Sequence, residues 1–275
     1  MVSSVIPKQN IELWQWQTWE DLPYLTCTLL SQWQHGFFTQ YFSPRIPKDL
    51  VEILQPKALA YRLKQVHGSQ VLTPTEMEVN RGYEEEILPA GDGIVSDDSL
   101  QALWVASADC TPVLIGDVVT GTVAALHSGW RGTAQKITPE AIKRFVASGS
   151  CLENLRIALG PAITGEVYQV DEEVAVQVGS SILDSLGLAK GDRNENGPAI
   201  LALLLDIPDS PILPDPLQGK VRLDVRRVIA LQLEQLGIEK EQIAIAPYCT
   251  YQQDDHFFSY RRTQRKQVQW SGIVS

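Results

Sequence analysis

The chain has 275 residues, of which 44% are hydrophobic and 20% charged, a composition typical of a folded protein and not of a disordered or fibrous one. Its 23 lysines and arginines against 33 aspartates and glutamates give a net charge of −10, which argues against a nucleic-acid polymer or an anionic membrane surface as partner. The chain start has no basic segment followed by an apolar one, and no run of about 18 apolar residues occurs, so we expect a cytoplasmic protein without a membrane span.

The first part of the chain predicts an entry strand and a loop, followed by a helix and a second strand. Residues 14–41 are rich in aromatic side chains, and prolines break the pattern after them, before helical spacing resumes at 48–54. Residues 58–66 alternate like a strand that delivers His67 and Gly68 into a turn. An acidic stretch follows around Glu84–Glu86.

The middle of the chain predicts sheet strands around one centre. Short apolar runs fill residues 103–128, with a glycine-containing hairpin signal at 119–122. Helical spacing follows at 133–146, and residues 155–159 form another apolar run that ends in Gly160 and Pro161.

The last part predicts two helices, near 171–186 and 223–236, and a strand at 243–249 before a polar and aromatic loop. Residues 190–219 are rich in Gly, Asn, Asp and Pro and are interpreted as an insertion. The fold class that we predict is a single mixed α/β domain over residues 1–275. It has a central mixed sheet with flanking helices, and its functional site lies at strand ends and loops.

The four cysteines are scattered singly, without CxxC pairs, and the chain is large enough not to need disulfides. We therefore expect reduced thiols in the cytosol. Most free cysteines act as small buried hydrophobic residues, and Cys110 is the exception considered next.

Three segments each place a metal-ligating side chain at the end of a predicted strand: His67 in KQVHGS, Cys110 in SADCTP and His127 in LHSGWRG. Two imidazoles and a thiolate suit zinc. Three protein ligands leave one coordination position for water or substrate, which is typical of catalytic zinc. The alternative for each histidine is a hydrogen-bonded structural imidazole, and no fixed spacing decides between them.

Seven segments together resemble the successive motifs of the YfiH-like laccase-domain family, from about Ala58 to the end. They are KQVHGSQV, GDGIVSDD, ADCTPVLIGD, ALHSGWRGTAQKI, LGPAITGEVYQVDEEV, LDVRRVIALQLEQLGI and PYCTYQQDDHFFSYRR. The resemblance implies zinc on His67, Cys110 and His127. It also implies phosphorolysis of adenosine, inosine, guanosine and methylthioadenosine by inorganic phosphate, with adenosine deaminase activity.

The chain departs from the family pattern in two places. It has TQYFSPRIPKDL where relatives carry a GGVS-like loop, and Ala162 where relatives often carry a cysteine. The family name also refers to copper oxidases, which need several coppers on many histidines, whereas this chain has only four histidines. Zinc is therefore favoured over copper, because it can polarise a base or lower the pKa of water for attack on a purine.

Phosphorolysis, as implied by the resemblance, requires a phosphate site. Arg131, between Gly129 and Gly132, offers a guanidinium and exposed amides before a predicted helix. The alternative is that the glycines only shape a turn while Arg131 pairs with a surface carboxylate. Arg261 and Arg262 are secondary candidates.

Four further residues are candidates for the site. Asp109 could orient the metal thiolate, and Asp92 could bind ribose hydroxyls or act as an acid or base, although carboxylates beside turns more often cap a loop. Trp130 and Phe257 could stack on a purine, although core packing is the simpler role for both.

Two other functions use the same residues. A cysteine hydrolase would use Cys110 as nucleophile and His127 as base. A non-catalytic module would use the metal as a structural staple and bind a partner through HFFSYRR.

Overall fold

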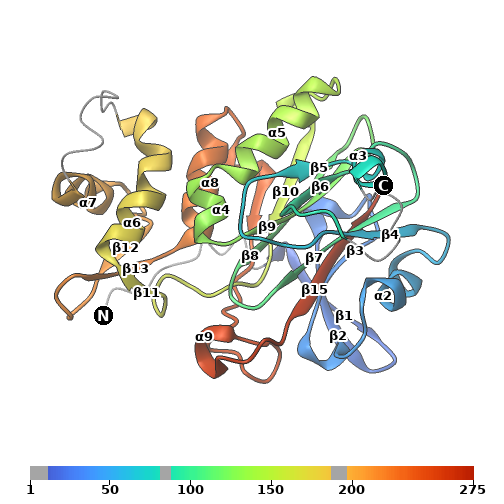
Figure 1. Cartoon of the computed structure of the whole chain (residues 1–275), viewed down its shortest axis with the longest axis horizontal. Helices are drawn as coiled ribbons and strands as arrows, with labels where there is room; N and C mark the ends of the chain where they lie inside the picture. Colours follow the sequence, from blue (N-terminus) through green and yellow to red (C-terminus); the bar gives the residue numbers. More distant parts are fainter. Residues whose placement is uncertain (1–11, 81–87, 187–196) are drawn as a thin grey trace.

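The computed structural model describes residues 12–80, 88–186 and 197–275 (Figure 1). The acidic stretch at Glu84–Glu86 and residues 190–196 of the predicted insertion lie outside the described residues. Within the described ranges, no helix is long and apolar enough to cross a membrane.

The described strands form two large sheets and one small sheet. The first sheet has the order β1-β2-β3-β15-β7-β4. Its strands are β1 (Trp14–Trp19), β2 (Leu22–Cys27), β3 (His35–Phe38), β15 (Gln269–Val274), β7 (Gln101–Ser107) and β4 (Leu59–Arg62). All neighbours are antiparallel except β4 and β7, so this sheet is mixed.

The second sheet has the order β14-β10-β8-β9-β6-β5 and is also mixed, because β10 pairs parallel with β14 and β5 with β6. Its strands are β14 (Ile243–Ile245), β10 (Leu155–Leu159), β8 (Thr111–Asp117), β9 (Val123–Ser128), β6 (Gly93–Val95) and β5 (Val71–Leu72). In a small third sheet, β13 (Lys220–Leu223) lies between β11 (Gln169–Asp171) and β12 (Ile212–Pro214).

The two large sheets pack face to face, with helices outside them. Alternation along β9 shows the layers, because Val123 and Ala125 join the core between the sheets, whereas Ala124 and Leu126 join the core beneath the helices. A third core packs α2 (Pro47–Leu54) on the outer face of the first sheet, against Trp104 and its neighbours. The order of layers is therefore helix, sheet, sheet, helices.

The remaining helices lie mainly on the second sheet and at one end of the molecule (Figure 1). They are α3 (Pro74–Asn80), α4 (Trp130–Ala134), α5 (Ile137–Ala147), α6 (Glu172–Gly179), α7 (Gly197–Asp206), α8 (Val225–Gln235) and α9 (Tyr260–Thr263). Local sequence explains where several of the helices begin. Asp224 caps α8 by accepting hydrogen bonds from the amides of Arg226 and Arg227, and Pro47 occupies the first position of α2.

The structure confirms the mixed α/β class and corrects several predicted elements. Residues 14–41 form three strands and not one strand and a loop, because the β1–β2 turn uses Glu20 and Asp21 at positive φ in place of the usual glycine. The helix predicted at 133–146 is two helices, α4 and α5, separated at Lys136, which has a φ of 62°. The strands predicted around one centre are divided between the two sheets, since β7 belongs to the first and β8 and β9 to the second.

Gly272 in β15 leaves room for the ring of Trp104, its cross-strand partner in β7, and its replacement tests this close contact. A Cβ at Gly272 would lie 2.5 Å from the Trp104 ring, and the tryptophan is fully buried. We expect Gly272→Ala to lower the free energy of unfolding by about 1–3 kcal/mol, because an overpacked core must shift. Chemical denaturation measures the change. Gly197→Ala is the control, because its Cβ would meet only Val176, at 3.8 Å, and an effect equal to that of Gly272→Ala would contradict the packing argument.

Candidate metal centre

His67, Cys110 and His127 lie together, although they come from three separate segments. The ligand atoms of the three residues lie within 4.8 Å of one another, and the two imidazole rings are 4.8 Å apart at 80°. His127 is buried, Cys110 is half-buried and His67 is exposed. The cluster is therefore enclosed by protein at His127 and open to solvent at His67.

Each of the three residues is placed by a different part of the two-sheet fold. His127 lies in β9, one residue before the strand ends. Cys110 lies in the turn where the chain passes from β7 in the first sheet to β8 in the second. His67 does not lie at a strand end as predicted, because β4 ends at Arg62 and the chain continues irregularly to a turn in which His67 has a φ of 60°.

Asp92 connects two of these segments through a fully buried carboxylate. It accepts hydrogen bonds from three successive backbone amides, of Val66, His67 and Gly68, at 3.1, 2.9 and 2.7 Å. The same carboxylate lies 2.9 Å from Nδ1 of His127. Burial alone would raise the pKa of Asp92, but the hydrogen bonds from His127 and from the amides of Gly68 and Val66 lower it. Its 0% exposure argues against the predicted contact with a ribose and points to a role in holding the cluster.

Gly129 and Gly132 bring the third segment close to the first two. A Cβ at Gly129 would lie 2.8 Å from Sγ of Cys110 and 3.3 Å from the His67 ring. A Cβ at Gly132 would lie 2.9 Å from the carbonyl oxygen of Gly68. Close packing is therefore sufficient to explain both glycines, and contact of their amides with phosphate stays a prediction.

The ionisation of Cys110 and His127 is mutually dependent. Burial would raise the pKa of the Cys110 thiol, but the charge of His127 and hydrogen bonds with both imidazoles lower it to about 6. Burial likewise opposes a charged His127, but Cys110 and Asp92 raise its pKa to about 9. A thiolate and an imidazolium therefore face each other near neutral pH in the metal-free protein. The thiolate is the form in which cysteine binds metals and attacks electrophiles.

Arg131 is exposed, and its guanidinium lies 4.2 Å from the centre of the Trp130 ring. Within the described part of the chain, no carboxylate forms an ion pair with Arg131. The alternative of a surface ion pair therefore lacks a partner there. Trp130 itself is half-buried and packs against the helical core.

A hydrogen bond joins Asp109 to Arg261. It connects the turn of residues 108–110 (the ADC turn), between β7 and β8, to the segment between β14 and β15. The Asp109 carboxylate accepts hydrogen bonds from the Thr250 hydroxyl and the Arg261 amide, both at 2.7 Å. The guanidinium of Arg261 donates to the carbonyl of Gln169 and lies 4.8 Å from the centre of the Tyr168 ring. Arg262 is not available to a ligand as supposed, because its guanidinium donates to the carbonyls of three loop residues, Thr250, Tyr251 and Phe257.

Tyr168 also belongs to this neighbourhood, although nothing in its residue type singled it out from the sequence. Burial raises the pKa of its hydroxyl, and charges of Cys110, Asp109, Arg261 and Arg131 all act on it, with a result of about 12. Tyr168 lies within the LGPAITGEVYQVDEEV motif, between a turn at residues 165–167 and β11, so the motif itself was the available signal.

The other predicted aromatic and histidine residues have structural surroundings. Phe257 is buried, as expected for core packing, and Ala162 is buried beside Cys249. His35 is buried, its Nε2 accepts a hydrogen bond from the amide of Cys27, and its Nδ1 donates one to the carbonyl of Trp33. His256 pairs with Asp255 and lies 4.9 Å from the Trp16 ring. All four cysteines are free.

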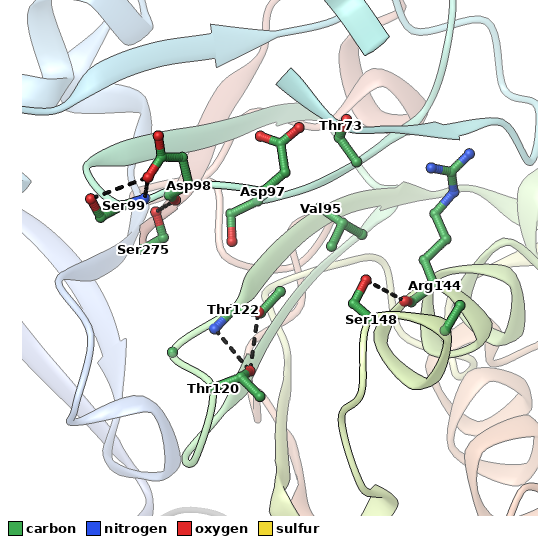
Figure 2. A pocket seen from close by; sticks show the side chains of 13 residues that line it. Thr73, Val95, Asp97, Asp98, Ser99, Thr120, Thr122, Arg144, Ser148 and Ser275 are labelled. Atoms are coloured by element: carbon green, nitrogen blue, oxygen red, sulfur yellow. Dashed lines mark hydrogen bonds between the residues drawn. The ribbon is translucent and has the colours of Figure 1, made fainter. Parts of the chain in front are cut away.

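The cavity in Figure 2, of about 590 Å³, is a different place from the His67–Cys110–His127 cluster. It is lined by Thr122, just before β9, and by Ser96, just after β6, whereas His127 lies near the other end of β9. Its charged groups have partners, since Asp97 accepts hydrogen bonds from Thr75 and Gln101 and Arg144 pairs with Glu76. Polar groups satisfied in this way offer little to a ligand, so the cluster remains the candidate site.

Comparison with known proteins agrees across sequence and structure. Residues 48–274 match the family model described as multi-copper polyphenol oxidoreductase laccase. The chain is 51% identical over 264 residues to a protein of Synechocystis sp. named purine nucleoside phosphorylase, with 96% of this chain and 98% of that protein covered. A purine nucleoside phosphorylase of Streptomyces coelicolor is 30% identical over 73% of this chain and 68% of its own length.

Two solved structures share the fold. YlmD from Geobacillus stearothermophilus superposes with a TM-score of 0.75 at 22% identity, covering 94% of this chain and 98% of its own. YfiH from Bacillus licheniformis superposes with a TM-score of 0.71 at 24% identity, covering 91% and 96%.

Replacing Asp92 tests whether the buried carboxylate holds the cluster. We expect Asp92→Asn to weaken the affinity of the cluster for added Zn²⁺ about 10- to 100-fold, because an amide loses one of the two acceptor oxygens that bind the turn and His127. Competition with a chromophoric chelator measures the affinity. Asp97→Asn is the control, since that carboxylate accepts hydrogen bonds in the cavity at the far end of β9. Unchanged zinc affinity in a folded Asp92→Asn protein would refute the role.

Proposed function

The chain belongs to the multi-copper polyphenol oxidoreductase laccase family, and on that premise we propose that it is a zinc-dependent purine nucleoside phosphorylase. The observation that carries the proposal is the cluster of His67, Cys110 and His127, open on one side and accompanied by Arg131 and Arg261. The identity of 51% to a protein named purine nucleoside phosphorylase supports the reaction class. The proposed substrates are adenosine, inosine, guanosine and methylthioadenosine with inorganic phosphate, and adenosine deamination is a second proposed activity.

The donor set fits zinc better than a multi-copper centre. Two imidazoles and a thiolate around a tetrahedral zinc stand roughly 3.5 Å apart, so a small contraction of the cluster would suffice. Among the described residues, the other two histidines are engaged elsewhere, His35 with the backbone and His256 with Asp255. Several coppers need more imidazoles than this leaves. Zinc, when bound, supplies Lewis-acid polarisation or activates water.

The residues of the chain would bind and orient the two substrates around that centre. In phosphorolysis a phosphate oxygen forms a bond to the anomeric carbon of the ribose while the bond to the purine nitrogen breaks. Arg131 is the proposed phosphate ligand, because its guanidinium is exposed, held against Trp130 and free of carboxylate partners among the described residues. Arg261 is the proposed second cation, fixed through Asp109 beside Cys110.

A cysteine hydrolase is the alternative with a specific observation in its favour. The lowered pKa of Cys110 and the raised pKa of His127 resemble an activated nucleophile with its base. A thiolate is equally what zinc binding requires, so the pair does not distinguish the functions by itself.

The free cysteines support the further proposal of a reducing, cytoplasmic location.

Metal content and turnover distinguish zinc chemistry from thiol chemistry. We expect about one zinc per chain, phosphate-dependent cleavage of inosine, and loss of both in His67→Ala, Cys110→Ala and His127→Ala, because each removes one of three ligands. A chelator should abolish turnover, and iodoacetamide should modify Cys110 only after the metal is removed. Elemental analysis, product chromatography and peptide mass spectrometry report these results. Full zinc in Cys110→Ala, or a covalent substrate adduct on Cys110, would favour the hydrolase.

Arg131→Ala should separate phosphorolysis from deamination. Loss of charge-assisted hydrogen bonds should raise the KM for phosphate about 10- to 100-fold, while zinc content stays intact and adenosine deamination, which consumes no phosphate, changes little. Arg131→Lys should recover only part of the loss, because lysine lacks the planar fork. A parallel fall of both activities in a fully metallated variant would show that Arg131 positions the nucleoside or supports the fold.

A further inference from the structure

Tyr168 is fixed in place by its backbone and by its ring. Its amide donates to the carbonyl of Thr164 at 3.0 Å, and its carbonyl accepts from the amide of Leu223, in β13, at 3.0 Å. The ring packs on the helical core on one side and lies beneath the guanidinium of Arg261, which is 4.8 Å from the ring centre. Because the ring is packed on the core and against Arg261, the side chain has little rotamer freedom left to lose when it binds a ligand.

The same contacts connect Tyr168 to the His67–Cys110–His127 cluster. The guanidinium of Arg261 is anchored by the carbonyl of Gln169, next to Tyr168, while the Arg261 amide binds Asp109, next to Cys110. The backbone carbonyl of Asp109 also accepts a hydrogen bond from the amide of Ile163. This bond holds the segment before Tyr168 against the ADC turn. The charges of Cys110 and of both candidate phosphate ligands, Arg131 and Arg261, all act on the phenol.

Among the residues that the structure describes, no group accepts a hydrogen bond from the hydroxyl of Tyr168. Within the described ranges, none of the hydrogen bonds of Tyr168 involves its hydroxyl, although the residue is half-buried and tyrosine hydroxyls in such places usually find a partner. Its pKa of about 12 keeps the group protonated, and therefore a donor, at every pH at which an enzyme of this kind would be assayed. A neutral donor accompanied by two guanidinium groups is suited to an oxyanion, which has several acceptor oxygens to satisfy.

We propose that Tyr168 binds the anionic co-substrate, donating a hydrogen bond from its hydroxyl to a phosphate oxygen that Arg131 and Arg261 also hold. This inference rests on the proposed phosphorylase function and adds a third ligand to its phosphate site. It also gives a function to the turn that leads into the small third sheet, since β13 and Arg261 set the position of the ring.

Tyr168→Phe tests the inference, because it keeps the ring beneath Arg261 and removes only the hydroxyl. With the zinc-loaded protein, the KM for inorganic phosphate and its Kd by calorimetry should both rise about 10- to 100-fold, since hydrogen bonds to charged groups contribute about 1.5–3 kcal/mol. The KM for inosine and the zinc content should change less than about twofold. Tyr41→Phe is the matched control, because Tyr41 is exposed near His256 and should leave both phosphate constants unchanged.

A measurement on the unmodified protein keeps the test independent of variant folding. Inorganic phosphate should slow oxidation of Tyr168 by hydroxyl radicals, which attack the neutral phenol, and should not slow oxidation of Tyr41, both measured by peptide mass spectrometry. Unchanged phosphate constants in Tyr168→Phe, equal increases in both KM values, or oxidation of Tyr168 that phosphate does not slow would each overturn the inference while wild-type phosphorolysis stands. A wild-type protein that neither binds phosphate nor cleaves inosine would instead overturn the proposed function, and this inference with it.

Discussion

The carboxylate of Asp92 is the constraint on which the candidate site depends, because a buried charge must be satisfied by groups that stay in place. It meets this requirement with the three amides of the turn at Val66–Gly68 and with Nδ1 of His127. One consequence is that the turn carrying His67 cannot move without exposing unpaired amides. A second is that the hydrogen bond at Nδ1 leaves Nε2 as the ring nitrogen that faces the cluster. A single side chain therefore fixes the backbone of one candidate ligand and the ring of another.

The two-sheet architecture explains how three distant segments meet. The chain crosses from the first sheet to the second at Ser107–Thr111, and this crossing carries Asp109 and Cys110 to the end of β9, where His127 lies. Positive φ at His67 and Asp109 allows the two turns to present their side chains toward the same point. Gly129 then removes the Cβ that would collide with Cys110. Close packing of backbone, more than sequence spacing, creates the cluster.

Much of this was accessible from the sequence, and the reasons for the failures are physical. The mixed α/β class, the helix at Pro47–Leu54 and the strand at Leu155–Leu159 follow from periodicity and were predicted. The β1–β2 turn was missed because Glu20 and Asp21 take a conformation that usually announces itself by glycine. The division into two sheets was not predictable, since alternation reports a buried face but not which sheet buries it.

The site shows the same limit. Residue chemistry singled out His67, Cys110 and His127 as a set, and the structure brings them together. The sequence could not show that Asp92 is buried, that the Arg262 guanidinium binds loop carbonyls, or that Tyr168 lies near the cluster. Each of these depends on contacts between segments far apart in the chain.

The placement of Cys110 at the crossing between the sheets has a consequence for the polymer as a whole. A metal shared by His67, Cys110 and His127 would act as a cross-link, closing one loop of roughly 40 residues and a shorter one, and the unfolded chain would lose the entropy of both. Whatever binds the folded form alone shifts the unfolding equilibrium by mass action. Metal occupancy and the folded fraction of the protein would then be coupled. A cell that starves this protein of metal would lose folded protein as well as activity.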